Sequence, residues 1–352
     1  MPVVAATFEP PRFHPARPDL VLPVRVDPTG EHGPTKPQAR GRGWRRTSHG
    51  LVLPARFAPE PVEQRIVEAA AVLPRDGFVT GWAGLRWLGL RELDGTRGGA
   101  RLPVPLLVPN HRIRPQPGFT VSAERMTRAD RDVVDGLPVT SAVRSLCFEM
   151  RYAAGLVAAV TLMDLAAGAD LVSRQEAWDY TAEFLGTWTG VEQCRQAIAL
   201  ADENSWSRME TEMRLLWGEI GIRRILCNHP VFDLDGRHVG TPDLFDAEAG
   251  LVGEYDSELH LEGRRRAQDL RREGAFRRLG LEYVTMVTRD RDDPSDFLRR
   301  TLDARYRGLA AAHLPRRWTV VPPAWWTPTV TVTQRRALTD AQRSRFLRRR
   351  AS

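Results

Sequence analysis

Residues 204–313 alternate helical patterns with short apolar segments, and this alternation restricts the fold more than any other feature of the chain. The stretch "SRMETEMRLLWGEIG" predicts an amphipathic helix that ends at Gly221. Two strands around a "DLDG" turn follow, then a strand in "AGLVGEYD", a basic helix that ends at Gly280, a strand in "LEYVTMVT" and a closing helix after Pro294. The order αβββαβα predicts an α/β domain rather than a β-sandwich or a helical bundle.

The other segments differ in composition and predict four further regions. Residues 1–49 are rich in Pro, Gly and Arg, and we expect a mostly extended tail. Residues 50–140 mix helix and strand patterns, which indicates an α+β domain. Residues 141–203 have helical patterns throughout and predict a connecting helical layer, and residues 314–352 predict a flexible basic tail that ends in "RSRFLRRR".

The charge of the chain favours a polyanionic partner. The net charge is +7 and the isoelectric point is about 10.0. Lys36 is the single lysine, so 51 − 1 = 50 of the basic residues are arginine, which can bind a phosphate through two hydrogen bonds. A catalytic lysine therefore cannot come from outside the N-terminal tail.

Sequence patterns for membranes, export and disulfides are absent. No run approaches about 20 apolar residues, and the N-terminus lacks the basic and apolar regions of a signal peptide. The three cysteines, Cys147, Cys194 and Cys227, are far apart and form no CxxC pair, which favours buried thiols over a metal or disulfide framework. We expect a cytoplasmic protein with no membrane partner.

Acidic residues gather in residues 241–260, "TPDLFDAEAGLVGEYDSELH". A carboxylate in a buried strand costs free energy unless something compensates it. If the strands on either side of the "AEAG" turn pair, Asp243 and Glu254 come close together, and Glu254 and Asp256 share one face. A cation or protonation would relieve their repulsion, and Mg²⁺ is a hard ion that takes oxygen ligands. The sequence therefore predicts a metal site at one edge of a sheet.

The same residues match the outline of a nuclease motif. A Pro-Asp pair and a glutamate 254 − 243 = 11 positions later are typical of PD-(D/E)xK nucleases, although Asp256 stands where lysine is usual. The segment from Ser207 to about Thr288 resembles the very-short-patch-repair-like (Vsr-like) endonucleases of that superfamily, which implies a restriction-endonuclease-like αβββαβ core. Ser257 stands where these proteins usually have glycine. The matching stretches are "SRMETEMR", "HPVFDLDGRHVGTPDLFD", "LVGEYDSELH", "RRRAQDLRREGAFRRLG" and "YVTMVTRD".

The resemblance implies a role for each matching residue. Mg²⁺ or Mn²⁺ would be held by a set of three carboxylates, and His260 or Asp256 would take a proton from the attacking water. Asp269 belongs to a "D-x-x-R" element with Arg272. The implied catalytic residues are Glu210, Asp243, Glu254, Asp256 and His260; the implied metal ligands are Asp243, Glu254 and Glu210; the implied phosphate contacts are Arg264, Arg265, Arg266 and Arg272.

Simpler structural roles remain open for several of these residues. Ser207 and Glu210 fit an S-x-x-E capping box at a helix N-terminus. Asp256 could cap a turn, and His260 could be structural or face solvent. Asp269 and Arg272 are three apart in a predicted helix and could form an i,i+3 salt bridge.

The N-terminal half resembles a different family. The stretch "RGWRRTSHGLVLPARF" is similar to the end of the winged-helix region in AbiEi-type antitoxins, and "GFVTGWAGLRWLGL", "LPVPLLVP" and "DGLPVTSAVRSLCFEM" are similar to the domain that follows it. Residues 1–49 contain no pair of helices that predicts a helix-turn-helix.

Two functions follow from these resemblances. The first is a magnesium-dependent endonuclease that hydrolyses phosphodiester bonds in nucleic acid, with DNA as the expected substrate. The second is a catalytically inactive DNA-binding transcriptional regulator or antitoxin of a type IV toxin–antitoxin system. Nucleic acid is the expected partner of both, with a cognate toxin or a repair protein as a further candidate.

Overall fold

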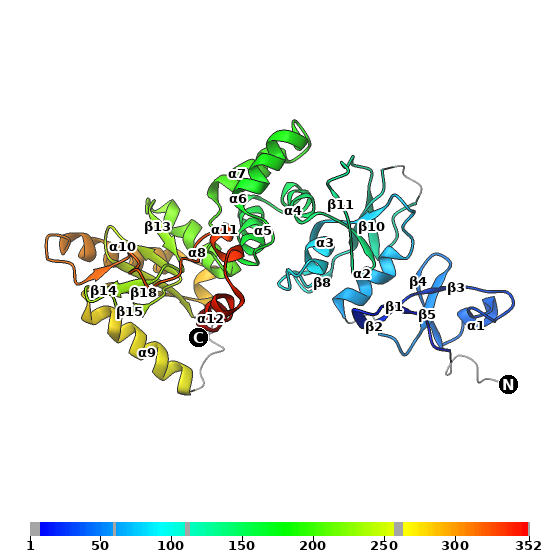
Figure 1. The fold of residues 1–352 in the computed structure, drawn as a ribbon, viewed down its shortest axis with the longest axis horizontal. Coiled ribbons are helices and arrows are strands. Elements are labelled where there is room, and N and C mark those ends of the chain that lie inside the picture. Colours follow the sequence, from blue (N-terminus) through cyan, green and yellow to red (C-terminus); the bar gives the residue numbers. More distant parts are fainter. Residues whose placement is uncertain (1–7, 59–60, 110–112, 257–262, 351–352) are drawn as a thin grey trace. The chain divides into compact units, whose positions relative to one another are not determined.

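The chain combines helices and sheets in two compact units (Figure 1). The structure, a computed structural model, describes residues 8–58, 61–109, 113–256 and 263–350, with the backbone alone for 263–269. One unit contains residues 1–152 with 183–185, and the other contains residues 153–182 with 186–352. No helix in the described part of the chain is long and apolar enough to cross a bilayer.

The first unit is built around a five-stranded sheet with the order β10-β9-β6-β12-β11. Its core is apolar and includes Trp82 and Trp87, which are 4% and 2% exposed. The strands are β6 (Phe78–Val79), β9 (Val104–Leu107), β10 (Phe119–Ser122), β11 (Arg131–Val134) and β12 (Leu137–Thr140), and the helices are α2 (Val62–Ala70), α3 (Gly81–Trp87) and α4 (Ala142–Arg151). A small hairpin joins β7 (Thr96–Arg97) to β8 (Ala100–Arg101).

The segment predicted as an extended N-terminal tail is folded in residues 8–49, so the structure differs from that expectation. Leu20, Val24 and Trp44 are buried there, and their burial stabilises short strands that the Pro-rich composition conceals. The elements are β1 (Arg12–His14), β2 (Arg17–Val21), β3 (Val24–Arg25), α1 (Lys36–Ala39), β4 (Trp44–Ser48) and β5 (Leu51–Pro54). The one helix described before residue 50, α1, has four residues, which is too short for a recognition helix.

The second unit begins with helices that pack on one another. Helix α5 (Leu156–Gly168) is apolar and largely buried, and it packs against α7 (Val191–Leu200) and α8 (Arg208–Glu219). Between them, α6 (Arg174–Tyr180) begins with a capping box in which Ser173 and Glu176 each bond the other's backbone N–H. A π-helical turn follows at Thr181–Leu185.

A four-stranded sheet with the order β13-β16-β17-β18 forms the centre of the second unit. Strand β16 is antiparallel to both neighbours, whereas β17 and β18 are parallel. The strands are β13 (Ile225–Cys227), β16 (Leu244–Asp246), β17 (Leu251–Asp256) and β18 (Glu282–Val287).

Helices cover the two faces of this sheet. Met213 and Trp217 of α8 and Phe297 of α10 (Ser295–Ala310) pack in one core, and Phe276 of α9 (Gly263–Arg278) packs in the other. Gly253 in β17 makes room for the Trp217 ring, because a Cβ at Gly253 would lie 2.6 Å from that ring. The sheet therefore lies between α8 and α10 on one side and α9 on the other.

Two predicted strands lie elsewhere than expected. The strands around the "DLDG" turn, β14 (Val231–Asp233) and β15 (His238–Gly240), do pair, but in a separate three-stranded sheet with β19 (Trp318–Thr319). Strand β16 lies in the segment expected to pair across the "AEAG" turn, and it does pair with β17. Its other neighbour is β13, a strand that the sequence did not predict because only three residues form it after two arginines.

The segment predicted as a flexible basic tail is also folded in residues 314–350. Helices α11 (Val332–Arg336) and α12 (Asp340–Arg350) form there. Arg335 is fully buried and donates to the Asp170 carboxylate at 2.6 Å and to the carbonyl of Ala167 at 2.7 Å. Arg336 bonds to Glu176 and Arg350 to the Gly168 carbonyl, so several of the arginines that suggested a solvated tail hold it against earlier helices of the same unit.

Candidate active site

Asp243 lies next to β17 in the central sheet. Asp243 immediately precedes β16, and the β16–β17 register pairs Leu244 with Gly253. Continuing that register by one residue places Asp243 opposite Glu254. The Asp243 Oδ2 accepts the backbone N–H of Tyr255 at 2.8 Å, which fixes its side chain against β17.

Glu210 approaches Asp243 from the first turn of α8. The Ser207 hydroxyl accepts the backbone N–H of Glu210 at 3.2 Å, so Ser207 caps the helix. The Glu210 carboxylate does not complete the reciprocal capping box on the Ser207 N–H. Its Oε2 instead accepts the Trp206 backbone N–H at 2.7 Å and the Asn228 side-chain amide at 2.5 Å.

Asn228 connects the two acids, and the sequence analysis did not identify it. Its side chain donates to Glu210, while its backbone N–H donates to the carbonyl of Asp243 at 3.0 Å. Asn228 has φ 44, a left-handed conformation that asparagine tolerates better than most residues. The only sequence signal is an asparagine two residues before Pro230, which is common in ordinary turns.

The Glu210–Asp243 pair is electrostatically unfavourable when both groups are ionised. The pKa of Glu210 is raised to about 8, first by burial and then by the charge of Asp243, while hydrogen bonds from Trp206 and Asn228 oppose the shift. Burial also raises the pKa of Asp243, opposed by the Tyr255 N–H and by the charge of Arg272. A proton or a cation would relieve this repulsion.

Glu254 is buried beside this pair, but its carboxylate contacts an arginine. It is 5% exposed, and its Oε2 accepts a hydrogen bond from Arg272 Nη2 at 2.9 Å. Arg272 is in α9, so the predicted phosphate contact and the predicted metal ligand are bound to each other in this structure.

The remaining predicted residues are placed differently or not described. Asp256 ends β17 and is exposed, although strand alternation puts it on the same face as Glu254. Ser257 and His260 lie outside the described residues. Four of the predicted residues in α9 have side chains outside the described part of the structure: Arg264, Arg265, Arg266 and Asp269. The proposed Asp269–Arg272 salt bridge therefore stays a prediction.

The predicted set of three carboxylate ligands is not assembled. Among the residues that the structure describes, no group of three or more His, Cys, Asp or Glu side chains is arranged to hold a metal ion. The physical reason is that Arg272 already neutralises Glu254. Glu210 and Asp243 remain, and Mg²⁺ is commonly held by one or two carboxylates together with water and substrate phosphate. The pair fits this smaller set of ligands.

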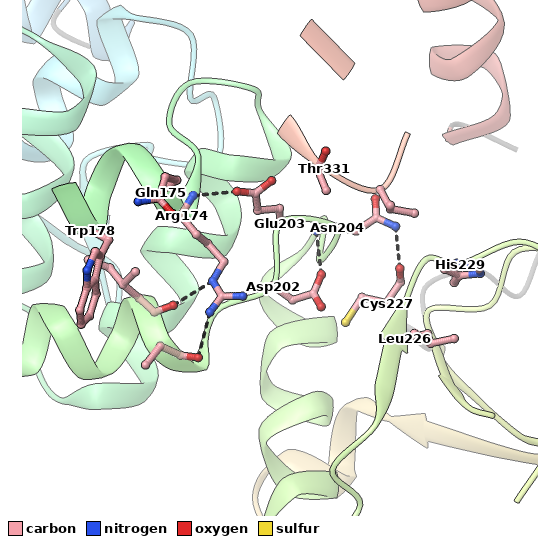
Figure 2. A pocket seen from close by; sticks show the side chains of 13 residues that line it. Arg174, Gln175, Trp178, Asp202, Glu203, Asn204, Leu226, Cys227, His229 and Thr331 are labelled. Atoms are coloured by element: carbon pink, nitrogen blue, oxygen red, sulfur yellow. Dashed lines mark hydrogen bonds between the residues drawn. The ribbon is translucent and has the colours of Figure 1, made fainter. Parts of the chain in front are cut away.

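A cavity of about 890 Å³ lies next to β13, with Cys227 and His229 in its lining (Figure 2). Arg174, Asn204 and Cys227 are among its lining residues, and Asn204 Nδ2 donates to the carbonyls of Cys227 at 2.6 Å and Asn228 at 3.0 Å. Burial raises the pKa of the Cys227 thiol, so the cavity offers no activated thiolate. None of the predicted site residues lines it.

Comparisons of the sequence with family models, with curated proteins and with solved structures found no match. What the carboxylate pair can do is therefore inferred from its own chemistry.

Proposed function

We propose that this protein is a metal-dependent endonuclease-like phosphodiesterase that acts on nucleic acid, with DNA as the expected substrate. The observation that carries the proposal is the Glu210–Asp243 pair, in which Glu210 is buried, Asp243 is half-buried and Asn228 bonds to both residues. The charge of Arg272 acts on Asp243, but the ion pair described for Arg272 is with Glu254. Perturbed carboxylates of this kind are typical of sites that bind a cation or transfer a proton.

The arrangement of the sheet supports the same proposal. Helix α8 supplies Glu210, the residue before β16 is Asp243, and β17 supplies Glu254, so a helix and two neighbouring inner strands supply the three acids. The order β13-β16-β17-β18, with helices on both faces, agrees with the restriction-endonuclease-like core that the sequence resemblance implies.

The residues of the chain would have distinct tasks in hydrolysis. Glu210 and Asp243 would hold Mg²⁺ or Mn²⁺, which when bound polarises a phosphodiester oxygen and lowers the pKa of water. Asn228 orients the Glu210 carboxylate, and the Tyr255 N–H orients Asp243. Asp256, exposed at the end of β17, is the described residue best placed to accept a proton from water.

The test is cleavage of end-labelled single-stranded and duplex DNA with Mg²⁺ or Mn²⁺. Asp243→Ala should reduce the rate by about a hundredfold or more, because it removes a charged group that acts on the transition state. EDTA should abolish cleavage. Asp235→Asn is the matched control, since Asp235 is an exposed acid in the β14–β15 turn, with a side chain 72% exposed. Cleavage that persists in Asp243→Ala or in EDTA would contradict the proposal.

One observation favours the second function, an inactive DNA-binding regulator or antitoxin. The Glu254–Arg272 ion pair puts an arginine where a metal would otherwise neutralise Glu254. A regulator would bind DNA equally well as wild type and as Asp243→Ala, and neither protein would cleave it. The same assay with a binding measurement therefore distinguishes the two functions.

A further inference from the structure

Two adjacent tryptophans follow β19, of which Trp325 is exposed and Trp326 is half-buried. Their ring centroids are 5.6 Å apart at an angle of 67°, and Trp325 is 62% exposed. They line a pocket of about 410 Å³, called here the tryptophan–arginine pocket, which consists of Trp325, Trp326, Thr327, Arg345, Arg348 and Arg349. Large aromatic rings are usually buried in a monomer, so an exposed ring beside a pocket suggests a ligand site.

Helix α12 divides its residues between two faces. On one face, Arg343 pairs with Asp170 at 3.1 Å, Phe346 is buried against Trp206, and Arg350 donates to the carbonyl of Gly168 at 2.7 Å. These contacts hold the helix in place.

The other face of α12 carries the arginines of the pocket. Arg345, Arg348 and Arg349 follow the i, i+3, i+4 spacing of one helical face, and all three are exposed. The anchoring contacts thus come from different residues than those that line the pocket.

Positive charge is concentrated over the aromatic rings. The Arg349 guanidinium lies 4.2 Å from the centroid of the Trp326 ring, a cation–π contact. Partial burial and the charge of Arg345 both lower the pKa of Arg349. An anion bound between these arginines would relieve their repulsion, whereas a neutral aromatic ligand alone would not.

The pocket is connected to the candidate active site through β15. The Trp326 ring packs against His238 of β15 with centroids 4.9 Å apart. His238 Nε2 lies 3.0 Å from the Thr241 hydroxyl, two residues before Asp243. These contacts join the pocket to the segment that leads into Asp243, and we expect a polymer bound in the pocket to extend toward the carboxylate pair.

We propose that the tryptophan–arginine pocket binds a single strand of nucleic acid, with an unpaired base stacked on Trp325 and its phosphates held by Arg345 and Arg348. Stacking on tryptophan tolerates any base, and arginines track the backbone without reading sequence. A duplex base has both faces covered by its neighbours, so the pocket should prefer single strands. Binding there needs neither a metal nor cleavage, and only the expected path toward Asp243 rests on the proposed function.

The test is fluorescence anisotropy of labelled oligothymidylate of about 15 nucleotides, and of a hairpin duplex, with the full-length protein in EDTA. Trp325→Ala should weaken binding of the single strand about tenfold, and Trp325→Phe should retain most of it. Arg345→Glu with Arg348→Glu should also weaken binding and make it less dependent on salt, because fewer counterions are released.

Matched controls separate local effects from overall charge. Trp178→Ala removes another exposed tryptophan, 47% exposed, and Arg223→Glu with Arg224→Glu reverses two exposed arginines elsewhere in the same unit. Both controls should bind as wild type does. Unchanged binding by Trp325→Ala would overturn the proposal, and so would a duplex bound as tightly as the single strand. Since EDTA prevents cleavage, neither result depends on whether the protein is a nuclease.

Discussion

Two buried carboxylates, Asp164 next to helix α8 and Glu210 within it, are compensated in different ways. Asp164 of α5 is fully buried and accepts hydrogen bonds from Arg214 at 2.6 Å, Thr211 at 2.8 Å and the Asp202 backbone N–H at 2.8 Å. Glu210 lies one helical turn before Arg214, and the donors described for it are the neutral N–H groups of its neighbours.

The difference separates a structural acid from a candidate functional one. Burial raises the pKa of Asp164 to about 6, and the charge of Arg214 limits the rise. Burial raises the pKa of Glu210 to about 8, and Asp243 adds a like charge to Glu210 where Arg214 gives Asp164 an opposite one. Arg214 compensates Asp164, whereas the described donors to Glu210 are neutral and Asp243 adds a like charge that a proton or a cation would relieve.

The largest change in stability is expected from breaking the Asp164–Arg214 ion pair. Asp164→Ala should lower the free energy of unfolding by about 3–5 kcal/mol, because it leaves the buried Arg214 charge without its partner. The measurement is urea unfolding followed by tryptophan fluorescence. The double variant Asp164→Asn with Arg214→Met should recover part of the lost free energy of unfolding. Glu210→Gln is the control, and we expect it to lower the free energy of unfolding less than Asp164→Ala does. A loss for Asp164→Ala no larger than that for Glu210→Gln would remove the contrast between the two sites.

The stability of the metal-free protein should depend on pH through Glu210. The unfolded carboxyl titrates near 4.5 and the folded one near 8, so between these values the folded protein binds more protons. Stability from this group therefore falls as pH rises through that window, by at most about 1.4 kcal/mol per pH unit.

Glu210→Gln should flatten this dependence, because the amide does not titrate. The measurement is the free energy of unfolding of both proteins in EDTA, between the pKa of 4.5 and the pKa of about 8. Adding Mg²⁺ near the upper end should restore stability to wild type more than to the variant. Parallel pH profiles for the two proteins would show that Glu210 is not the group responsible.

Strong local periodicity made part of the fold predictable from the sequence. The strand "LVGEYD" coincides with β17, and the helices before and after it match α8, α9 and α10 to within two residues at each end. The folded C-terminal segment was not predictable, because Arg335 is satisfied by Asp170, which is 165 residues away in the sequence. Composition alone cannot distinguish such a buried arginine from a solvated one.

The candidate site was predictable only where an acid conflicts with its local environment. Asp243 and Glu254 were identified because a carboxylate at a buried strand requires compensation. The contact of Glu254 with Arg272 and the bridging role of Asn228 arise from tertiary packing. Neither leaves a pattern in the spacing of residues along the chain.

The smallest effect is expected from Arg272, which gives Glu254 the same kind of compensation that Arg214 gives Asp164. Arg272→Met should lower the free energy of unfolding by about 1–3 kcal/mol in the metal-free protein, because it leaves a buried carboxylate without this donor.

If the Glu210–Asp243 pair is a cation site, the Glu254 carboxylate becomes available beside Asp243 once Arg272 is replaced. Mg²⁺ should then raise the melting temperature of Arg272→Met more than that of wild type. Arg214→Met is the matched control, since Asp164 faces no second acid among its described contacts and should gain nothing from Mg²⁺. Equal responses of both variants to Mg²⁺ would mean that the two carboxylate sites differ in burial alone and not in their capacity to bind a cation.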